Sequence, residues 1–515
     1  MMAVSSVEDL LLRVESAAMP MHISSLTIYD PSSATDGKVG FKDIMRFFSE
    51  RLYRNKVFRH KVQHGPLGIG TGFWVDDPEF DIEFHVRHIA LPKPGDWRQL
   101  CIQVARLHAR HLDTNRPLWE CYVIEGIDNI PGVPAGSFAL LLKTHYAALG
   151  GGPGTQLLAA LHELSPSGKA SPPKQQAYFK NLPTVADMLL SSASDSLRWP
   201  LKLGRYLNCY FSPLTMYAGG KISDSANWWL RTVQRMPNAD ANPVQKTRFN
   251  AKVSPHRVFE AVKFDLAQIS QIRDQVPNAS SNDVLICVIA GALRHYLQEK
   301  GELPLLSLVA EAPLTSRSEM RINSIRSLAD SAIMAIHTEQ ANPLLRLQEI
   351  VQETRNNKKN FQSFLGKRLL LDAADLIPNL LMKSVGEIVR RSNLASHLPA
   401  QFNTSISSLR GPDLPLFMSG ARLVGYYGMD VVHDLAGLSH LICYFAGQAS
   451  ISVTACRKLL PDPAHYALCL QRSMQELLDS VKLPEAQPAI VSKPARKARR
   501  SPTRPASRAS AGATM

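Results

Sequence analysis

Two long stretches of the chain, residues 5–165 and 256–480, each alternate helical with strand-like patterns, and this alternation constrains the fold most. The strand-like segments are short apolar runs rich in β-branched and aromatic residues, such as 136–144. The helical segments place apolar side chains three and four positions apart, as in 154–164. At 515 residues the chain also exceeds what one hydrophobic core usually supports. We therefore predict a pseudo-duplicated α/β protein with a cleft between its halves, although no internal sequence repeat proves duplication.

The two halves are separated by a segment of different character. The run SPSGKASPPKQQ at 165–176 breaks the first alternating stretch, and residues 177–255 then interleave Trp, Tyr and Phe with Arg and Lys. This pattern predicts two or three helices, which either cross between the halves or contact a water–lipid interface, where Trp and Tyr beside cations are favoured. We divide the chain into an N-terminal domain (1–165), a helical crossover (166–255), a C-terminal domain (256–485) and a tail (486–515).

The tail carries half of the net charge. Of the +14 on the chain, seven positive charges lie in 486–515, which has no acidic residue. Its richness in Pro, Ser and Ala predicts disorder, because such a segment cannot bury a core. The tail is interpreted as a solvated extension, as a contact to an anionic membrane surface or, least favoured, as a nucleic-acid contact. Since no nucleic-acid-binding fold accompanies it, we do not expect nucleic acid as a partner.

The composition indicates in which cellular compartment the protein is found. The seven cysteines are scattered without a CxxC pair, which favours a reducing, intracellular environment. The first 22 residues have acidic groups inside their apolar stretch, unlike a signal peptide. No run of about 18 uncharged apolar residues exists, which excludes an ordinary membrane-spanning helix. We predict a cytoplasmic protein that meets lipid only at a surface.

One predicted strand leads into residues that are candidates for catalysis. The apolar run 136–144 ends at His145, and Tyr146, two alanines, Leu149, Gly150 and Gly151 follow. This segment resembles the HHxxxDG motif of the bacterial wax ester synthase/diacylglycerol acyltransferase family. That family lies within the chloramphenicol-acetyltransferase-like superfamily of CoA-dependent acyltransferases.

Further blocks occur in the order and spacing of that family. They are PMH at 20–22, PLWE at 117–120, ND at 282–283, PLTSR at 313–317 and SGARL at 419–423. Because the resemblance covers about residues 5–480, the chain is identified as a member. It implies two CoA-dependent acyltransferase-like α/β domains, each with a mixed sheet flanked by helices. A tunnel for acyl-CoA and acceptor would lie between them, as ligand sites often do in two-domain proteins.

The resemblance also implies substrates and a binding cleft. The reaction would transfer an acyl group from long-chain acyl-CoA to a fatty alcohol or diacylglycerol, with no cofactor and no metal. The protein would touch an anionic membrane, at its inner face, or lipid inclusions. The residues that would line the cleft are Pro117, Leu118, Trp119, Asn282, Asp283 and Arg422. Each of the three blocks also has a purely structural interpretation: Trp119 as a core residue, Asn282 as a helix cap and Arg422 as a solvated charge on a strand.

Two departures from the family motif concern proton transfer. Acyl transfer requires a base that takes the hydroxyl proton of the acceptor. The family's base is the second His of the motif, here Tyr146, and the family's Asp is Gly150. A phenol is only about a thousandth ionised at neutral pH and is a poor base. Strand alternation directs His145 away from the face of Tyr146, so we expect a half-buried histidine bonded to a neighbour. The alternative is that the glycine run 150–152 turns the backbone and His145 replaces the catalytic base.

Further departures lie near the end of the family pattern. The family's SNVPGP is SSLRGP at 407–412, without the Asn, and its closing acid is Cys456. The functional hypothesis is therefore an acyl-CoA:alcohol O-acyltransferase homologue with altered or lost activity. The alternative is a non-catalytic acyl-CoA- or lipid-binding relative that acts at membranes or lipid inclusions.

Overall fold

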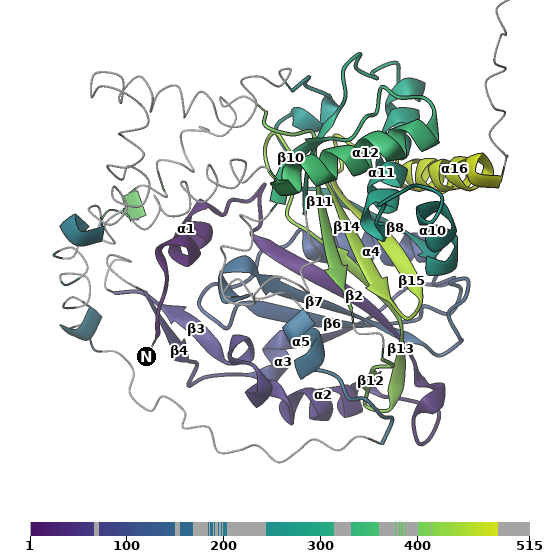
Figure 1. Ribbon diagram of the computed structural model, residues 1–515. Helices are drawn as coiled ribbons and strands as arrows, with labels where there is room; N and C mark the ends of the chain where they lie inside the picture. Colours follow the sequence, from purple (N-terminus) through teal and green to yellow (C-terminus); the bar gives the residue numbers. More distant parts are fainter. Residues whose placement is uncertain are drawn as a thin grey trace, which may run out of the picture.

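A computed structural model gives the fold of most of the two alternating stretches (Figure 1). The residues that it describes are 2–65, 72–149, 155–167, 244–313, 331–359, 400–411 and 414–482, with scattered positions at 184–202 and 376–387. The tail at 486–515, most of the 177–255 segment, and Gly150 and Gly151 lie outside the described residues.

The N-terminal half is built on a sheet of six strands in the order β12-β13-β2-β7-β6-β5. All neighbours are antiparallel except β5 and β6, which run parallel. The strands are β2 (His22–Asp30), β5 (Val86–Ala90), β6 (Trp119–Glu125), β7 (Phe138–His145), β12 (Phe417–Met418) and β13 (Ala421–Met429). The helices of this half are α1 (Ser6–Val14), α2 (Phe41–Ser49), α3 (Ile82–His85), α4 (Trp97–His108) and α5 (Thr155–Ala160).

A small three-stranded sheet adjoins this half, in the order β1-β4-β3. Its strands are β1 (Met2–Ala3), β3 (His60–Gln63) and β4 (Phe73–Asp76). Short 3-10 helices complete the irregular segments: η1 (Pro31–Ser33), η2 (Leu52–Arg54), η3 (Lys56–Phe58), η5 (Tyr146–Leu149) and, after the crossover, η7 (Arg248–Asn250).

The C-terminal half contains a second six-stranded sheet, in the order β10-β9-β11-β14-β15-β8. It is mixed, because β11 runs parallel to both β9 and β14 while the other pairs are antiparallel. The strands are β8 (Arg257–Asp265), β9 (Val309–Pro313), β10 (Ser331–Ala335), β11 (Thr404–Arg410), β14 (Leu438–Phe445) and β15 (Gln448–Cys456). The helices are α10 (Leu266–Arg273), α11 (Ser281–Glu299), α12 (Pro343–Lys359) and α16 (Pro463–Lys482).

Helix α11 is the centre of the C-terminal core. It begins at a capping box, in which the Ser280 side chain accepts from the Asp283 backbone and Asp283 accepts from the Ser280 backbone. Its apolar residues are buried on nearly every side because α10, α12 and α16 contact it. A helix that is apolar all round is stable only when it is enclosed in this way.

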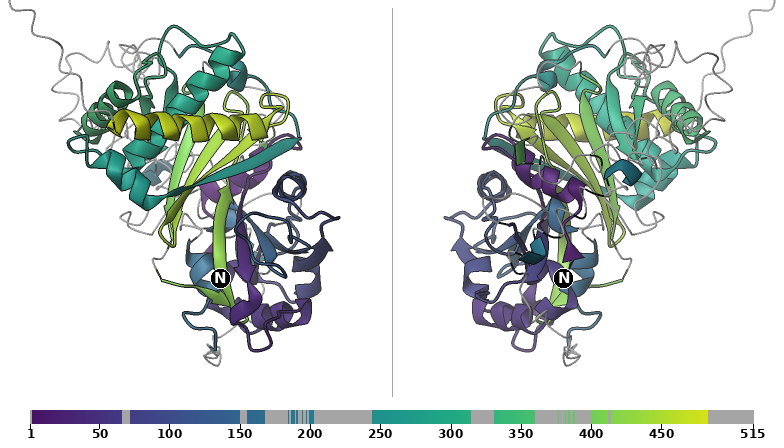
Figure 2. Two further views of the ribbon diagram at one scale, coloured as in Figure 1. Left: turned by 90° about the vertical axis from the view of Figure 1, so that its right-hand side faces the viewer. Right: turned by 90° about the vertical axis from the view of Figure 1, so that its left-hand side faces the viewer.

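The two halves are joined by an exchanged strand. β13 pairs with β2 of the N-terminal sheet, although the sequence assigns residues 421–429 to the C-terminal domain. Figure 2 shows this green strand running from the C-terminal half into the purple N-terminal half. β13 also bonds to β15, since the Gly428 N–H donates to Ser452 Oγ (3.3 Å) and Ser450 Oγ donates to the Tyr426 carbonyl (3.0 Å). Both sheets are thus anchored to one strand.

Packing across the junction adds to this strand exchange. Helix α4 of the N-terminal half lies against β8 of the C-terminal half. There Trp97 Nε1 donates to the carboxylate of Glu260, which is buried, and burial raises the pKa of Glu260. The predicted class of fold, two α/β domains with mixed sheets, is confirmed. Among the described residues, no helix is both long and apolar enough to cross a membrane.

Candidate functional site

The degenerate motif lies where β7 ends and the 3-10 helix η5 begins. β7 is buried along almost its whole length because its two faces pack into separate hydrophobic cores, with Phe138 and Leu140 in one and Ala139 and Leu141 in the other. At its end the His145 N–H donates to the Leu118 carbonyl (3.0 Å), and the Tyr146 N–H donates to the Met21 carbonyl (2.9 Å). The PMH and PLWE blocks are therefore the backbone neighbours that hold the motif in position.

His145 is sealed inside the protein. Its side chain is 0% exposed, and its Nδ1 accepts a hydrogen bond from the Ala147 N–H (3.1 Å). Its Nε2 has no hydrogen-bond partner among the described residues and lies 3.9 Å from Glu15 Oε2. Burial lowers the pKa of His145 to about 4, and the nearby Glu15 only partly opposes this shift. The predicted bond to a neighbour is present, but the ring is fully buried rather than half-buried.

Glu15 connects this buried histidine to the surface. It accepts from the Met21 N–H (3.0 Å) and pairs with His111 Nδ1 (3.2 Å). Burial opposes ionisation of Glu15, but the contact with His111 and the charges around it lower its pKa overall. The same contact with Glu15 raises the pKa of His111. The Glu15 carboxylate thus contacts His111 and the Met21 backbone, and it does not hydrogen-bond His145.

Tyr146 turns toward the C-terminal half. Its hydroxyl donates to Asp430 Oδ1 (2.7 Å), and Ser407 Oγ donates to Asp430 Oδ2 (3.1 Å). The Val431 N–H donates to Oδ1 as well (2.8 Å). Asp430 follows β13 and Ser407 lies on β11, so three distant parts of the chain meet at one carboxylate. Sequence reasoning missed Asp430, because a single acid after an apolar strand has no distinguishing local pattern.

A second polar cluster lies at the start of α11. Tyr444 donates its hydroxyl to Asn282 Oδ1 (2.7 Å), and Asn282 Nδ2 donates to Ser408 Oγ (3.3 Å). Burial raises the pKa of Tyr444. Because neighbouring residues of a strand face opposite sides, Ser408 points to the helix side of the sheet whereas Ser407 points to Asp430.

The ND block divides into two roles. Asp283, and not Asn282, closes the helix cap: its Oδ2 accepts from the Ser280 N–H (2.8 Å) and hydroxyl (2.6 Å). Its Oδ1 accepts from Thr354 Oγ1 (3.0 Å) on α12. Asp283 is therefore occupied entirely by structural contacts, and only Asn282 is part of the polar cluster at β11.

Of the remaining predicted site residues, Leu118 adjoins the motif through its backbone carbonyl, which accepts from the His145 N–H, whereas Arg422 lies far from Tyr146. Pro117, Leu118 and Trp119 are buried. The Trp119 ring stacks on His85 (4.6 Å between ring centroids), and its Nε1 donates to the Phe58 carbonyl (3.1 Å). Arg422 is exposed and lies eight residues before Asp430 on β13, about 25 Å away at the rise of an extended strand. Trp119 is thus packed inside the N-terminal half, and Arg422 is an exposed strand residue.

A cavity of about 320 Å³ adjoins the motif turn. Ala147, Ala148 and Leu149 of η5 form one wall. The rest is lined by apolar side chains (Met2, Val57, Trp74 and Leu157) and by polar ones, of which Arg54 and Lys56 are cations and Glu8, Asn55 and His60 are not. This size is at the lower limit for small-molecule sites, and it would hold one segment of a lipid substrate rather than all of it.

Comparison with known proteins decides the family. The model of the wax ester synthase/diacylglycerol acyltransferase catalytic domain matches residues 4–285, and that of the WS/DGAT C-terminal domain matches residues 330–478. The chain belongs to this family. The first match includes the degenerate motif and the second includes Asp430.

Named relatives agree with this assignment along nearly the whole chain. A Mycobacterium tuberculosis protein named "Probable diacyglycerol O-acyltransferase tgs2" is 28% identical over 492 residues, which cover 92% of this chain and 98% of the relative. The O-acyltransferase WSD of Acinetobacter baylyi is 26% identical over 475 residues, covering 91% and 95%.

Solved structures confirm the fold. The wax ester synthase/diacylglycerol acyltransferase of Marinobacter aquaeolei VT8 superposes with a TM-score of 0.64 at 22% identity, covering 94% of this chain and 100% of that structure. The starter condensation domain of rhizomide synthetase RzmA reaches 0.50 at 12% identity, covering 94% and 95%. At these identities the likeness concerns the fold alone.

Proposed function

We propose that this WS/DGAT family member binds long-chain acyl-CoA and an alcohol, either a fatty alcohol or diacylglycerol, at the junction of its halves and transfers the acyl group slowly. Family membership supports the substrate class. The proposal that transfer is slow rests on the hydrogen bond from the Tyr146 hydroxyl to Asp430 (2.7 Å). At the position of the family's base, this chain has a proton donor whose proton is already engaged.

The chemistry follows from what each group can accept. The acceptor hydroxyl must lose its proton as its oxygen attacks the thioester carbonyl. Tyr146 donates to Asp430, and His145 is buried with a pKa of about 4. A carboxylate such as Asp430 is weakly basic and already accepts three hydrogen bonds. None of Tyr146, His145 and Asp430 therefore combines access with suitable basicity, and a loss of about 10²–10⁴-fold in rate follows.

The second candidate is a purely binding role, as an acyl-CoA- or lipid-binding protein at membranes or lipid inclusions. The same observation supports it, since a phenol held by Asp430 preserves the architecture of the junction without supplying a base. The two candidates differ in residual turnover. Slow transfer would show multiple turnovers per protein molecule, whereas a binding protein would show none above the uncatalysed reaction.

The test measures binding and turnover on the full chain. Palmitoyl-CoA should raise the melting temperature more than CoA alone does, because ligands that bind only the folded state stabilise it. CoA release with hexadecanol or dioleoylglycerol should be at least ~10²-fold slower than that of the Acinetobacter baylyi relative assayed in parallel. His145→Asn, which keeps an acceptor for the Ala147 N–H, should not change the residual rate. Vigorous turnover that is abolished in this variant would refute the proposal.

Peripheral contact with lipid is part of the proposal. The seven cations of 486–515 and the aromatic and cationic residues of 177–255 support contact with the anionic inner face of the membrane or with lipid inclusions. Flotation with phosphatidylserine-containing liposomes should recover the chain at low salt and less of it at high salt, since salt screens such contacts. Deletion of 486–515 should weaken the binding. An absence of binding at low ionic strength would remove this part of the proposal.

A further inference from the structure

Three side chains with metal-binding chemistry converge between α11 and α16, far from the motif. They are Glu299, the last residue of α11, and His465 and Cys469, which lie one turn apart on α16. A carboxylate oxygen, an imidazole nitrogen and the thiol sulfur all lie within 4.8 Å of one another. We propose that Glu299, His465 and Cys469 form a zinc-binding site that fastens α11 to α16.

The spacing on α16 suits a shared ligand. Residues four apart on a helix project from the same face, so His465 and Cys469 point to one side. Glu299 comes from the adjacent helix and already contacts His465, with 2.6 Å between Oε2 and Nε2. Tetrahedral zinc with bonds of 2.0–2.3 Å needs its ligand atoms about 3.3–3.6 Å apart. Small side-chain rotations would bring all three atoms to that separation.

The surroundings distinguish this site from a simple surface ion pair. Glu299 and His465 are about 40% exposed, so an ion can enter and keep a water as its fourth ligand. Cys469 is 2% exposed, which protects its sulfur on the core side. Arg472 Nη1 lies 3.6 Å from Oε1 of Glu299 and leaves Oε2 turned to His465. Such an outer partner orients a ligating carboxylate.

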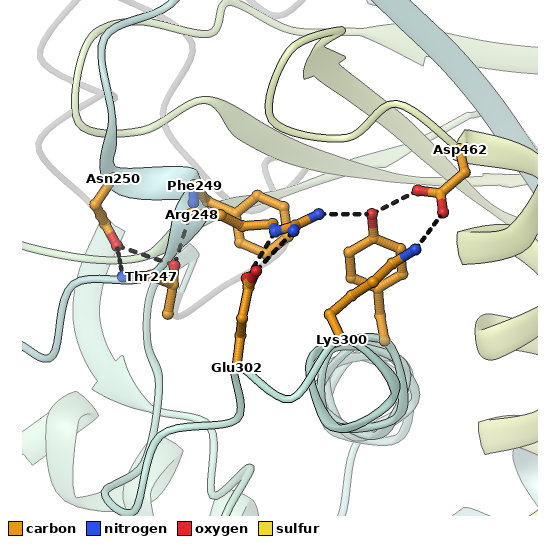
Figure 3. Close-up of polar contacts among 8 residues, drawn as sticks. Thr247, Arg248, Phe249, Asn250, Lys300, Glu302 and Asp462 are labelled. Atoms are coloured by element: carbon orange, nitrogen blue, oxygen red, sulfur yellow. Dashed lines mark hydrogen bonds and ion pairs between the residues drawn. The ribbon is translucent and has the colours of Figure 1, made fainter.

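The two helices are already held in register by a neighbouring network (Figure 3). Asp462, just before α16, accepts from the Tyr296 hydroxyl (2.5 Å) and from Lys300 Nζ (2.7 Å) at the end of α11. Arg248 donates to the Tyr296 hydroxyl (3.2 Å) and to both oxygens of Glu302 (2.7 Å each). A metal site whose scaffold is rigid loses less entropy when it binds the ion.

The set of ligands selects the metal. Thiolate and imidazole favour zinc over magnesium or calcium, which prefer oxygen. Burial, with Glu299 adding to it, raises the pKa of Cys469 to about 11, so binding at neutral pH would displace the thiol proton to solvent. The site lies about 26 Å along α11 from Asn282, given the rise of a helix. Its effect should therefore be on stability, independently of acyl transfer.

The test uses the full chain stripped with EDTA. Zinc should raise the melting temperature by about 3 °C at a concentration tenfold above Kd, and magnesium should not. Cobalt in place of zinc should give a thiolate-to-metal charge-transfer band. Cys469→Ala and His465→Gln should lose both signals. The matched control is His295→Gln, which removes another histidine–glutamate contact between the same helices (2.8 Å to Glu476) and should keep both.

The cobalt band also separates this site from a second cluster, His337, Glu339 and Glu349, which contains no thiol. The proposal would be overturned if zinc stabilised the unaltered chain but cobalt gave no thiolate-to-metal band in it. This outcome does not depend on whether the variants fold. A band and a temperature shift that both persist in Cys469→Ala would overturn it equally.

Discussion

Replacing Tyr146 with histidine should convert a slow protein into a faster acyltransferase. The backbone at this position is held on one side by the hydrogen bond of Tyr146 N–H to Met21 and on the other by that of His145 N–H to Leu118. A new side chain would therefore leave in the same direction, toward Asp430. It would supply an imidazole with a pKa near neutrality, which is the property that the phenol lacks.

The expected gain lies at the lower end of what a positioned base contributes. An imidazole reaches less far than a phenol, so its contact with Asp430 would be mediated by water rather than direct, and its orientation less well fixed. We expect about 10²-fold in turnover, which corresponds to about 2.7 kcal/mol in the barrier. Adding Gly150→Asp, the family's second residue, should increase the gain. Loss of the hydrogen bond to Asp430 should lower stability by about 1–2 kcal/mol.

The assay is the initial rate of CoA release from palmitoyl-CoA with hexadecanol, with the ester confirmed by chromatography. Tyr146→Phe loses the same hydrogen bond without gaining a base, and Tyr53→His places a histidine in another 3-10 helix of this half, so neither should be faster than the unaltered chain. The gain should decline below about pH 6.5 as the imidazole becomes protonated. If Tyr146→His is no faster than Tyr146→Phe, or if the unaltered chain is already fast and Tyr146→Phe abolishes it, the reasoning is wrong.

Three further predictions concern stability and titration. Burial lowers the pKa of His108 and His440 to about 3, below the ~6.5 of an unfolded chain, so the unfolded state binds more protons as the pH falls from about 6.5 toward 3. Stability should decline over that window by up to about 1.4 kcal/mol per pH unit for each, and equal urea midpoints at pH 7 and pH 5 would contradict this. Asn282→Ala leaves two hydroxyl groups without their partner and should cost about 1–3 kcal/mol by urea denaturation, whereas a cost near zero would show that water replaces it. Glu15→Gln should return the raised pKa of His111 toward about 6.5 in an NMR titration, and an unchanged value would assign the shift to another group.

Local patterns in the sequence determined the class of fold and the position of the motif. Buried strands such as β7 are short and largely apolar, and α11 has a serine cap and an acid in its first turn, so both are set by interactions between near neighbours. The cap is Ser280, one residue before the positions that the sequence suggested. The order of the family blocks then identified the family without any knowledge of contacts. The expectation that His145 faces away from Tyr146 relied on strand alternation, whereas in the structure β7 ends at His145 and Tyr146 begins η5.

The tertiary structure decided which strands pair and which side chains meet. β13 lies in the N-terminal sheet because its edge pairs with β2, and strand pairing over some 400 residues leaves no periodic trace in either segment. Asp430 became the partner of Tyr146 only through that exchange. Trp119 packs against His85 and Phe58, which composition cannot reveal. Local propensity acts between residues a few positions apart, whereas the chemistry of this junction depends on side chains brought together by long-range packing.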